Sequence, residues 1–469
     1  LEANTTADNN TAIGKSALSA NTTATQNTAV GANALAANTT GANNTGIGTN
    51  TLFDNTTGAE NTALGVGALA NNTTASNNTA VGRAALVGNT TGADNVAIGR
   101  IALTANTTAS NNTAVGSLAL QANTTGTGNT VVGKDAGQSI TTGNYNTAMG
   151  LDSLENVTTA DDNTAIGYYA LQANTGAENT AVGRSALAAN TTANDNTAIG
   201  KGAMLANTTG ASNVAIGAAA LDANTTASSN VAIGQGSMTA NTTGARNVAI
   251  GASSLLTNTT GSFSTAVGYQ ALKSSNQSAN TAIGHEAMEL STGADSCTAV
   301  GGQALKNSTG DDNTAVGRYA LVTNTGGALN TAVGYQSLKA NTTASQNTAV
   351  GTNSLLANTT GDNLCAIGFD ALGANTTATN NTACGSKAAN QITTGSNNTA
   401  VGFDALTRCT TGVSNACFGK DAGDNITTGG YNTCLGIDSG TNITQGSAHV
   451  MVGDSTNASA ENSQNEIVI

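Results

Sequence analysis

Proline and tryptophan are absent from this 469-residue sequence, aromatic residues make up 3% of it and charged residues 9%. Disordered chains are usually rich in charge and proline, so the low hydrophobicity does not by itself indicate disorder. Apolar runs are only a few residues long, which excludes a transmembrane helix. Gly, Ala, Asn and Thr dominate instead. This composition suits tight coils stabilised by backbone hydrogen bonds and small side chains.

Basic residues and cysteines are also few. The 14 Lys and Arg residues are scattered and the net charge is −13, which argues against a nucleic-acid partner because phosphate binding needs clustered basic side chains. All six cysteines lie from Cys297 onward and none precedes it, so they do not form a disulfide framework. No signal peptide is visible and the chain begins at Leu1 without methionine, so we expect a processed or trimmed sequence.

A 17-residue repeat organises the whole chain. We number its positions 1 to 17 from Asn27 to Asn43, so that Val30 is position 4 and Gly31 position 5. Position-5 glycines recur from Gly14 to Gly453, and all but three of the intervals between them equal the full repeat. A period this strict predicts one elongated stack of similar coils. We assign residues 1–453 to the repeat array and residues 454–469 to an exit segment. The three exceptions, each shorter by a single residue, are Gly167 to Gly183, Gly268 to Gly284 and Gly301 to Gly317.

Two positions are predicted to face inward. Position 4 is apolar in all 27 copies, and position 9 is Leu in 19 and Met in three. The run N-T-A-V/I reads as a short strand ending at a glycine with positive φ, and x-x-A-L as a second short extended run before an N-T-T-G/A turn. The predicted fold is therefore all-β: a parallel β-solenoid, or β-roll, of about 27 coils with 17 residues each. The alternative, a helix at positions 6 to 11, leaves little room for a return strand.

An exchange between positions 9 and 12 supports a shared interior. Where position 9 loses its leucine, to Gly137, Ala389, Gly423 or Gly440, position 12 changes from Asn to Ile (Ile140, Ile392, Ile426 and Ile443). The two positions are predicted to fill the same volume. An Asn at position 12 then either forms a stacked amide ladder or faces outward.

Two large apolar side chains per coil would make a thin core. Positions 3 and 8 are mostly Ala, and we expect this small-residue face to bury itself against identical chains, most simply in a threefold bundle. The alternative is a monomeric solenoid with a narrow, alanine-filled interior.

The repeat resembles known fibre proteins. N-T-A-V/I-G-x-x-A-L is similar to the head repeat of trimeric autotransporter adhesins, and the full unit with its N-T-T-G turn resembles repeats of tail-fibre-type proteins of phages, bacteria and their viruses. GKDAGQSITTGNYNTAMG (133–150), GKDAGDNITTGGYNTCLG (419–436) and the ending NSQNEIVI resemble further segments of those proteins. The resemblance implies a left-handed, homotrimeric β-roll in an extracellular fibre, often followed by a self-cleaving chaperone domain, which this sequence does not include.

Little in the sequence indicates chemistry. His285 and His449 are too far apart for a dyad or a metal site, and both are predicted to be solvated surface residues. The acidic pairs Asp161–Asp162 and Asp311–Asp312 lack a calcium-binding nonapeptide, so a solvated rim is expected. We predict no catalytic, cofactor or metal site.

Two residue patterns remain as site candidates. Sixteen copies of position 12 open an N-x-T sequon, and they are possible N-glycan acceptors along one edge unless N-T-T is only a turn sequence. Cys417 and Cys434 share position 3 in successive coils, so they are predicted to stack as thiols, or as a bridge. The sequons include Asn21, Asn38, Asn106, Asn241 and Asn375.

The leading functional hypothesis is a stiff structural shaft of an extracellular fibre, on a virion or a cell surface, that self-associates as a trimer or longer filament and is not an enzyme. One alternative is a rod that binds a surface glycan or receptor through exposed positions, with dispersed aromatic side chains as first contacts. Another is an ice-binding solenoid, for which the adjacent threonines at positions 13 and 14 are poorly arranged because they point to opposite sides of the chain. Those aromatic residues are Tyr168, Tyr169, Tyr269, Tyr335, Phe369 and Phe403.

Overall fold

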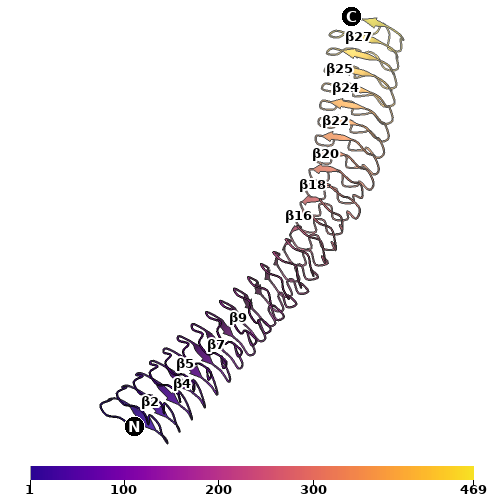
Figure 1. Cartoon of the computed structure of the whole chain (residues 1–469). Coiled ribbons are helices and arrows are strands. Elements are labelled where there is room, and N and C mark those ends of the chain that lie inside the picture. The colour runs from indigo at the N-terminus through magenta and orange to yellow at the C-terminus, as the bar shows by residue number, and fades with distance from the viewer. Residues whose placement is uncertain (1) are drawn as a thin grey trace. The chain divides into compact units, whose positions relative to one another are not determined.

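Each repeat forms one turn of a parallel β-solenoid (Figure 1). The computed structural model describes residues 2–469 and contains no helix in that range. The chain divides into two units, Leu1–Asn230 and Val231–Ile469, and each has the same construction. The predicted all-β solenoid of about 27 turns with about 17 residues per turn is thus confirmed.

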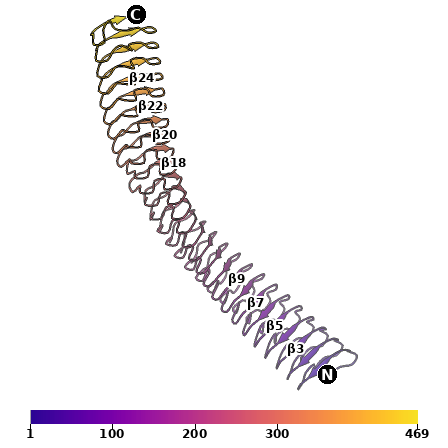
Figure 2. The same cartoon turned by 180° about the vertical axis from the view of Figure 1, so that it is seen from behind.

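One short strand per turn forms the sheet of each unit, and the strands follow one another in chain order (Figure 2). The strands of the first unit are β1 (Thr11–Ile13), β2 (Thr28–Val30), β3 (Thr45–Ile47), β4 (Thr62–Leu64), β5 (Thr79–Val81), β6 (Val96–Ile98), β7 (Thr113–Val115), β8 (Thr130–Val132), β9 (Thr147–Met149), β10 (Thr164–Ile166), β11 (Thr180–Val182), β12 (Thr197–Ile199) and β13 (Val214–Ile216).

The second unit continues with the same three-residue strands and ends with a two-residue strand. Its strands are β14 (Val231–Ile233), β15 (Val248–Ile250), β16 (Thr265–Val267), β17 (Thr281–Ile283), β18 (Thr298–Val300), β19 (Thr314–Val316), β20 (Thr331–Val333), β21 (Thr348–Val350), β22 (Cys365–Ile367), β23 (Thr382–Cys384), β24 (Thr399–Val401), β25 (Ala416–Phe418), β26 (Thr433–Leu435), β27 (Val450–Val452) and β28 (Ile467–Val468).

Within a unit, neighbouring strands pair in parallel with equal repeat positions opposite each other. Thr11 pairs with Thr28, for example, and Ala12 with Ala29. At the C-terminus, β28 pairs with β27 and Gln464 forms a bridge to Ser447, so the predicted exit segment 454–469 stays hydrogen-bonded to the coil before it.

The strand is turned the other way from our prediction. Position 3 faces inward, as Ala29 with 0% exposure shows, whereas position 4 faces outward, with Ile98 39% exposed and Leu435 48% exposed. Successive side chains of a strand point to opposite faces, so only one of these two positions is inside. Space decides which: at position 3 of one coil, Gly46, an added Cβ would lie 2.9 Å from Thr51 Oγ1 and 3.5 Å from Leu35 Cδ1, so this coil has no room even for a methyl group. Most other coils have Ala or Ser in place of Thr51 and hold an alanine at position 3, and the larger branched side chain of position 4 is placed outside.

The predicted second extended run is a series of turns instead. Backbone φ is positive at positions 5, 7 and 9, with values of 136° at Gly31, 58° at Asn33 and 53° at Leu35. A left-handed φ costs a leucine roughly 1–2 kcal/mol. Leu35 is nevertheless held there by full burial and by its N–H, which donates to Thr51 O at 2.9 Å in the next coil.

Glycine at position 5 is required by the stacking of coils as well as by its φ. An added Cβ at Gly31 would lie 2.4 Å from Gly48 O of the next coil, closer than atoms can approach. The Gly31 N–H donates to Ile13 O of the previous coil at 2.8 Å. The expected turn at this glycine is confirmed.

Alanines at positions 3 and 8 fill the interior with the position-9 side chain. Ala29, Ala34 and Leu35 are all 0% exposed. The prediction that these alanines form a face for neighbouring chains is therefore wrong, because side chains of the same solenoid already cover them.

The exchange between positions 9 and 12 is confirmed as a packing rule, and it includes position 3. An added Cβ at Gly137 would lie 3.1 Å from Ile140 Cδ1 and 3.2 Å from Val131 Cγ2. Gly423 and Gly440 likewise face Ile426 and Ile443, together with a cysteine at position 3. Replacing leucine by glycine thus creates room for Ile at position 12 and a larger residue at position 3, whereas the coil with Ala389 gains Ile392 but keeps Ala383 at position 3.

The three shortened intervals all lack position 14. Gly176, Gln277 and Gly310 each stack on the position-15 residue of an adjacent coil, which shows that the missing residue comes just before them. Position 14 is an exposed threonine in most coils, so its loss shortens the turn without changing the interior.

Candidate interaction surface

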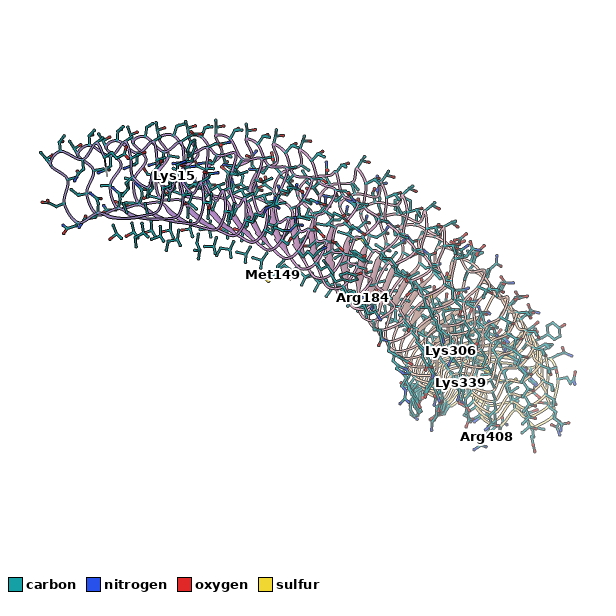
Figure 3. The ribbon with its side chains drawn as sticks, turned by 90° about the horizontal axis from the view of Figure 1, so that it is seen from below. Lys15, Met149, Arg184, Lys306, Lys339 and Arg408 are labelled. Atoms are coloured by element: carbon teal, nitrogen blue, oxygen red, sulfur yellow. The ribbon has the colours of Figure 1, made fainter. Side chains whose placement is uncertain are left out.

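The outward side of the strands presents two parallel ranks of side chains, which we call the sheet face. It consists of position 2, mostly Thr, and position 4, mostly Val or Ile. Along the face, exposed fractions at position 4 include 60% at Ile13, 36% at Ile216 and 42% at Ile367. Met149, 49% exposed, is labelled in Figure 3 where its side chain points away from the ribbon. Each unit therefore carries a continuous apolar stripe on its sheet.

Two ladders of buried asparagines run inside the coil, one just before the strand and one at the N-T-T turn, and they meet on one carbonyl. Asn27 Nδ2 (position 1) and Asn38 Nδ2 (position 12) both donate to Gly41 O, at 3.0 and 2.9 Å. Asn27 Oδ1 accepts the N–H of Asn44 in the next coil at 2.9 Å, and Asn38 Nδ2 also donates to Asn21 Oδ1 at 3.1 Å. The asparagines thus replace backbone pairing where the chain turns.

From the second coil onward, these ladders remove the position-12 sequons from the surface. From Asn21 onward the asparagines at position 12 are 0% exposed, whereas Asn4 in the first coil is exposed; Asn241 Nδ2, for example, donates to Gly244 O at 2.9 Å. A glycan on such a nitrogen has no space in the folded coil, so the folded chain does not present these residues as acceptors. The residues concerned are Asn21, Asn38, Asn106, Asn241 and Asn375.

Where the position-12 ladder is interrupted, an acceptor is left without a partner. Asn123 Oδ1 precedes Ile140 and Asn375 Oδ1 precedes Ile392, and both oxygens are buried without a hydrogen bond. An unpaired buried polar atom costs about 1–3 kcal/mol. The larger apolar side chain at position 12 offsets this cost through packing.

His449 occupies position 1 and substitutes for an asparagine of the ladder. It is 0% exposed, so the prediction of a solvated side chain is wrong for His449. Its Nε2 lies 2.7 Å from Ser463 O, and its Nδ1 accepts the Glu466 N–H at 3.2 Å. These are the contacts that Asn Nδ2 and Oδ1 make in other coils, and they require a neutral imidazole with its proton on Nε2. Its place in the repeat was the signal that could have revealed this role.

His285 lies outside, with 60% of its side chain exposed, stacked on Tyr269 at a centroid distance of 5.6 Å. Beside it, Lys306 Nζ contacts Glu286 Oε2 at 2.8 Å and Glu289 Oε2 at 3.0 Å. The Lys306 ammonium, through its hydrogen bond, lowers the pKa of the Glu286 carboxyl. This charged cluster connects three coils, two of which belong to the shortened kind.

Cys417 and Cys434 lie opposite each other in the register of β25 and β26, both with 0% exposure and both as free thiols. A hydrogen bond with Cys434, together with burial, raises the pKa of the Cys417 thiol well above its usual value. An added Cβ at Gly423 would lie 2.7 Å from Cys417 Sγ. The thiols therefore fill the space left by the missing leucine.

The expected acidic rim contributes to coil stacking. Asp161 Oδ1 accepts the N–H of Asn144 at 2.7 Å, and Asp311 Oδ1 accepts the N–H of Asp295 at 2.9 Å. Each carboxylate at position 16 thus completes the hydrogen bonding of the coil before it. Within residues 2–469, no group of three or more His, Cys, Asp or Glu side chains is arranged to hold a metal ion.

The described part of the chain encloses no pocket. It also has no helix with the length and apolarity needed to cross a membrane. No protein-family model matches the sequence, and no curated protein matches it significantly. The extended surfaces, above all the sheet face, are therefore what the structure offers for interaction.

Proposed function

We propose that this chain is the structural shaft of an extracellular fibre, on a virion or a cell surface, and that copies of it associate through the sheet face. The single observation that carries the proposal is the outward stripe of apolar side chains, mostly Val and Ile, at position 4 of each unit. Contiguous apolar patches larger than roughly a few hundred Å² are uncommon on monomers and mark interaction sites.

The stripe supplies enough energy for association only when many coils act together. Ile367 is 42% exposed, and covering that fraction recovers about 0.8 kcal/mol if full burial of an isoleucine is worth about 2 kcal/mol. Summed over the 13 strands of the first unit, this gives on the order of 10 kcal/mol, comparable with the rough 4–15 kcal/mol cost of association. A long repeat is therefore well suited to side-by-side packing, whereas a few isolated coils are not.

A homotrimer is the arrangement we propose, with left-handed coils, on the strength of the resemblance to trimeric fibre repeats. A closed threefold bundle covers the same face on every copy and leaves none of it free to recruit further chains. The coil-to-coil backbone bonding, which leaves strand edges only at the ends, would then make a stiff spacer.

Lysines on the sheet face test the proposal. In the double variant Val350→Lys and Ile367→Lys, charges would be buried in the contact between copies, so the mass in solution should fall from three times 45.5 kDa to 45.5 kDa. The matched control, Thr360→Lys and Thr377→Lys, adds the same charges at exposed position 14 and should keep the mass of the wild type. A wild-type chain that is monomeric at every concentration would contradict the proposal.

The sheet face also favours a second candidate, an ice-binding surface. The Thr rank and the Val/Ile rank lie on one side of the sheet, spaced by ~4.8 Å along the stack and ~6.8 Å across it. This differs from positions 13 and 14, where the threonines are adjacent. Self-association and ice binding would compete for the same atoms, so a monomer that shows thermal hysteresis supports the second candidate and a trimer without it supports the first.

A further inference from the structure

A second surface of the Val231–Ile469 unit carries regularly spaced aromatic rings. Position 6 is Tyr335, Phe369 and Phe403 in every second coil, so that each ring lies two repeats from the next. The coils between them carry the small polar residues Thr352 and Ser386. The three rings are 44%, 46% and 49% exposed, so they stand out from the coil as separate platforms.

The alternation of rings is confined to these three coils, because position 6 is Gly302 two coils before Tyr335 and is aliphatic two coils after Phe403. Ile437 lies two coils after Phe403 and is 53% exposed, and Tyr269, 49% exposed, lies four coils before Tyr335. In the Leu1–Asn230 unit the same position is mostly basic or small, with one aromatic residue, Tyr168. The ring pattern is therefore a property of one part of the array and not of the repeat itself.

Neighbouring side chains add hydrogen-bonding groups beside each ring. The position-7 residues Gln336, Asp370 and Asp404 directly follow the three rings, and each is partly exposed. Flat apolar platforms flanked by amide and carboxylate groups suit a ligand that has both C–H faces and hydroxyl edges. The adjacent carboxylates and the net charge of −13 disfavour a nucleic acid, whose bases also stack on aromatic rings.

The spacing selects the ligand further. Two coils correspond to ~9.6 Å at ~4.8 Å per parallel strand. A β-1,4-linked hexose polymer presents the same face of its sugar ring at every second residue, and its two-sugar repeat is close to this distance. We propose that Tyr335, Phe369 and Phe403 form a linear binding site for an extended, uncharged β-1,4-linked polysaccharide, with one ring under every second sugar.

The site is tested by measuring how much of the full chain is depleted from solution by microcrystalline cellulose and by chitin. Granular starch serves as the polymer of different linkage. Wild-type protein should bind at least one of the β-1,4 polymers and not starch. The triple variant with Ala at the three ring positions should bind at least a hundredfold more weakly. Equal binding to starch, or no binding of the wild type to either β-1,4 polymer, would overturn the proposal.

A register variant separates spacing from mere aromatic content. Exchanging Phe369→Ser with Ser386→Phe keeps the composition but places rings three coils and one coil apart, so binding should weaken at least tenfold. Binding equal to the wild type would overturn the proposal. Both variants should keep the solution mass and the protease resistance of the wild type, because position 6 is not part of the sheet face. Failure of this site therefore leaves the fibre proposal intact, and the reverse also holds.

Discussion

The combination of Gly at position 9 and Ile at position 12 can be introduced by mutation into a coil that has Leu and Asn at these positions. The coil of residues 95–111 has Leu103 at position 9, Asn106 at position 12 and Ala97 at position 3, all 0% exposed. Replacing them by Gly, Ile and Val reproduces the natural combination of Gly137, Ile140 and Val131. The single variants should be costly and the combined variant much less so.

The magnitudes follow from the contacts. Leu103→Gly creates a cavity worth about 3–5 kcal/mol, reduced by roughly 1 kcal/mol because glycine accepts the φ of 53° without strain. Asn106→Ile loses the hydrogen bond to Ala109 O at 2.9 Å and leaves Asn89 Oδ1 without its donor, at a cost of about 2–3 kcal/mol. If the sites were independent, the double variant would lose roughly 6 kcal/mol.

Because the isoleucine side chain fills the cavity of the missing leucine, we expect the double variant to lose only about 3 kcal/mol, a coupling of roughly 3 kcal/mol. Adding Ala97→Val, which matches Val131, should recover part of the remainder. Global unfolding of a repeat array is not two-state, so the assay is amide hydrogen exchange of residues 95–111, followed by mass spectrometry.

A pair of distant sites serves as the control. Leu103→Gly combined with Asn207→Ile, six coils away, should be additive within about 0.5 kcal/mol. The reasoning is refuted if Leu103→Gly and Asn106→Ile are additive to the same degree, because the two side chains would then not share one volume.

Three further predictions concern the turn and the C-terminal coil. Deleting Thr108 at exposed position 14 should leave the exchange protection of its coil close to that of the wild type, as in the naturally shortened coils, whereas deleting Ala109, whose carbonyl accepts hydrogen bonds from two asparagines, should abolish that protection. His449→Asn should preserve protection of the Glu466 amide and His449→Ala should reduce it about tenfold, because only asparagine restores both hydrogen bonds. Hydrogen bonds from Ser459 hold the pKa of Glu466 down to about 2, so its stabilising effect is complete above its ordinary pKa of about 4.3 and is lost between about pH 4 and 2. Glu466→Gln should remove this acid sensitivity of exchange in β27, and an unchanged pH profile would contradict the assignment.

The repeat period was enough to predict the coil, the parallel register and the burial of Leu35. It was not enough to orient the strand, because hydrophobicity favours Val30 over Ala29 as the inward residue. The opposite wall decides: Leu35 already fills the interior, and only a methyl group fits beside it. Hydrophobicity in a sequence predicts which side chains avoid water, whereas the width of the solenoid interior limits the size of the side chain that can be buried there.

Asparagine at position 12 illustrates a second limit. Its side chain suits an exposed turn and a buried amide ladder equally well, so Asn38 could not be placed from its identity. The exchange to Ile140 pointed inward, and the shared carbonyl acceptor Gly41 O explains why an amide is tolerated there. His449 was predictable in principle, since a residue that replaces Asn at position 1 inherits its two hydrogen bonds.

Cys384 gives the most direct test of the claim that the sheet face is covered by other copies of the chain. It occupies position 4 of β23 and is exposed, whereas Cys297, Cys409, Cys417 and Cys434 are buried. We predict that a maleimide labels Cys384 rapidly in the monomeric Val350→Lys, Ile367→Lys variant and at least a hundredfold more slowly in the native assembly. Equally rapid labelling in both would show that the face is open to solvent and would contradict the account.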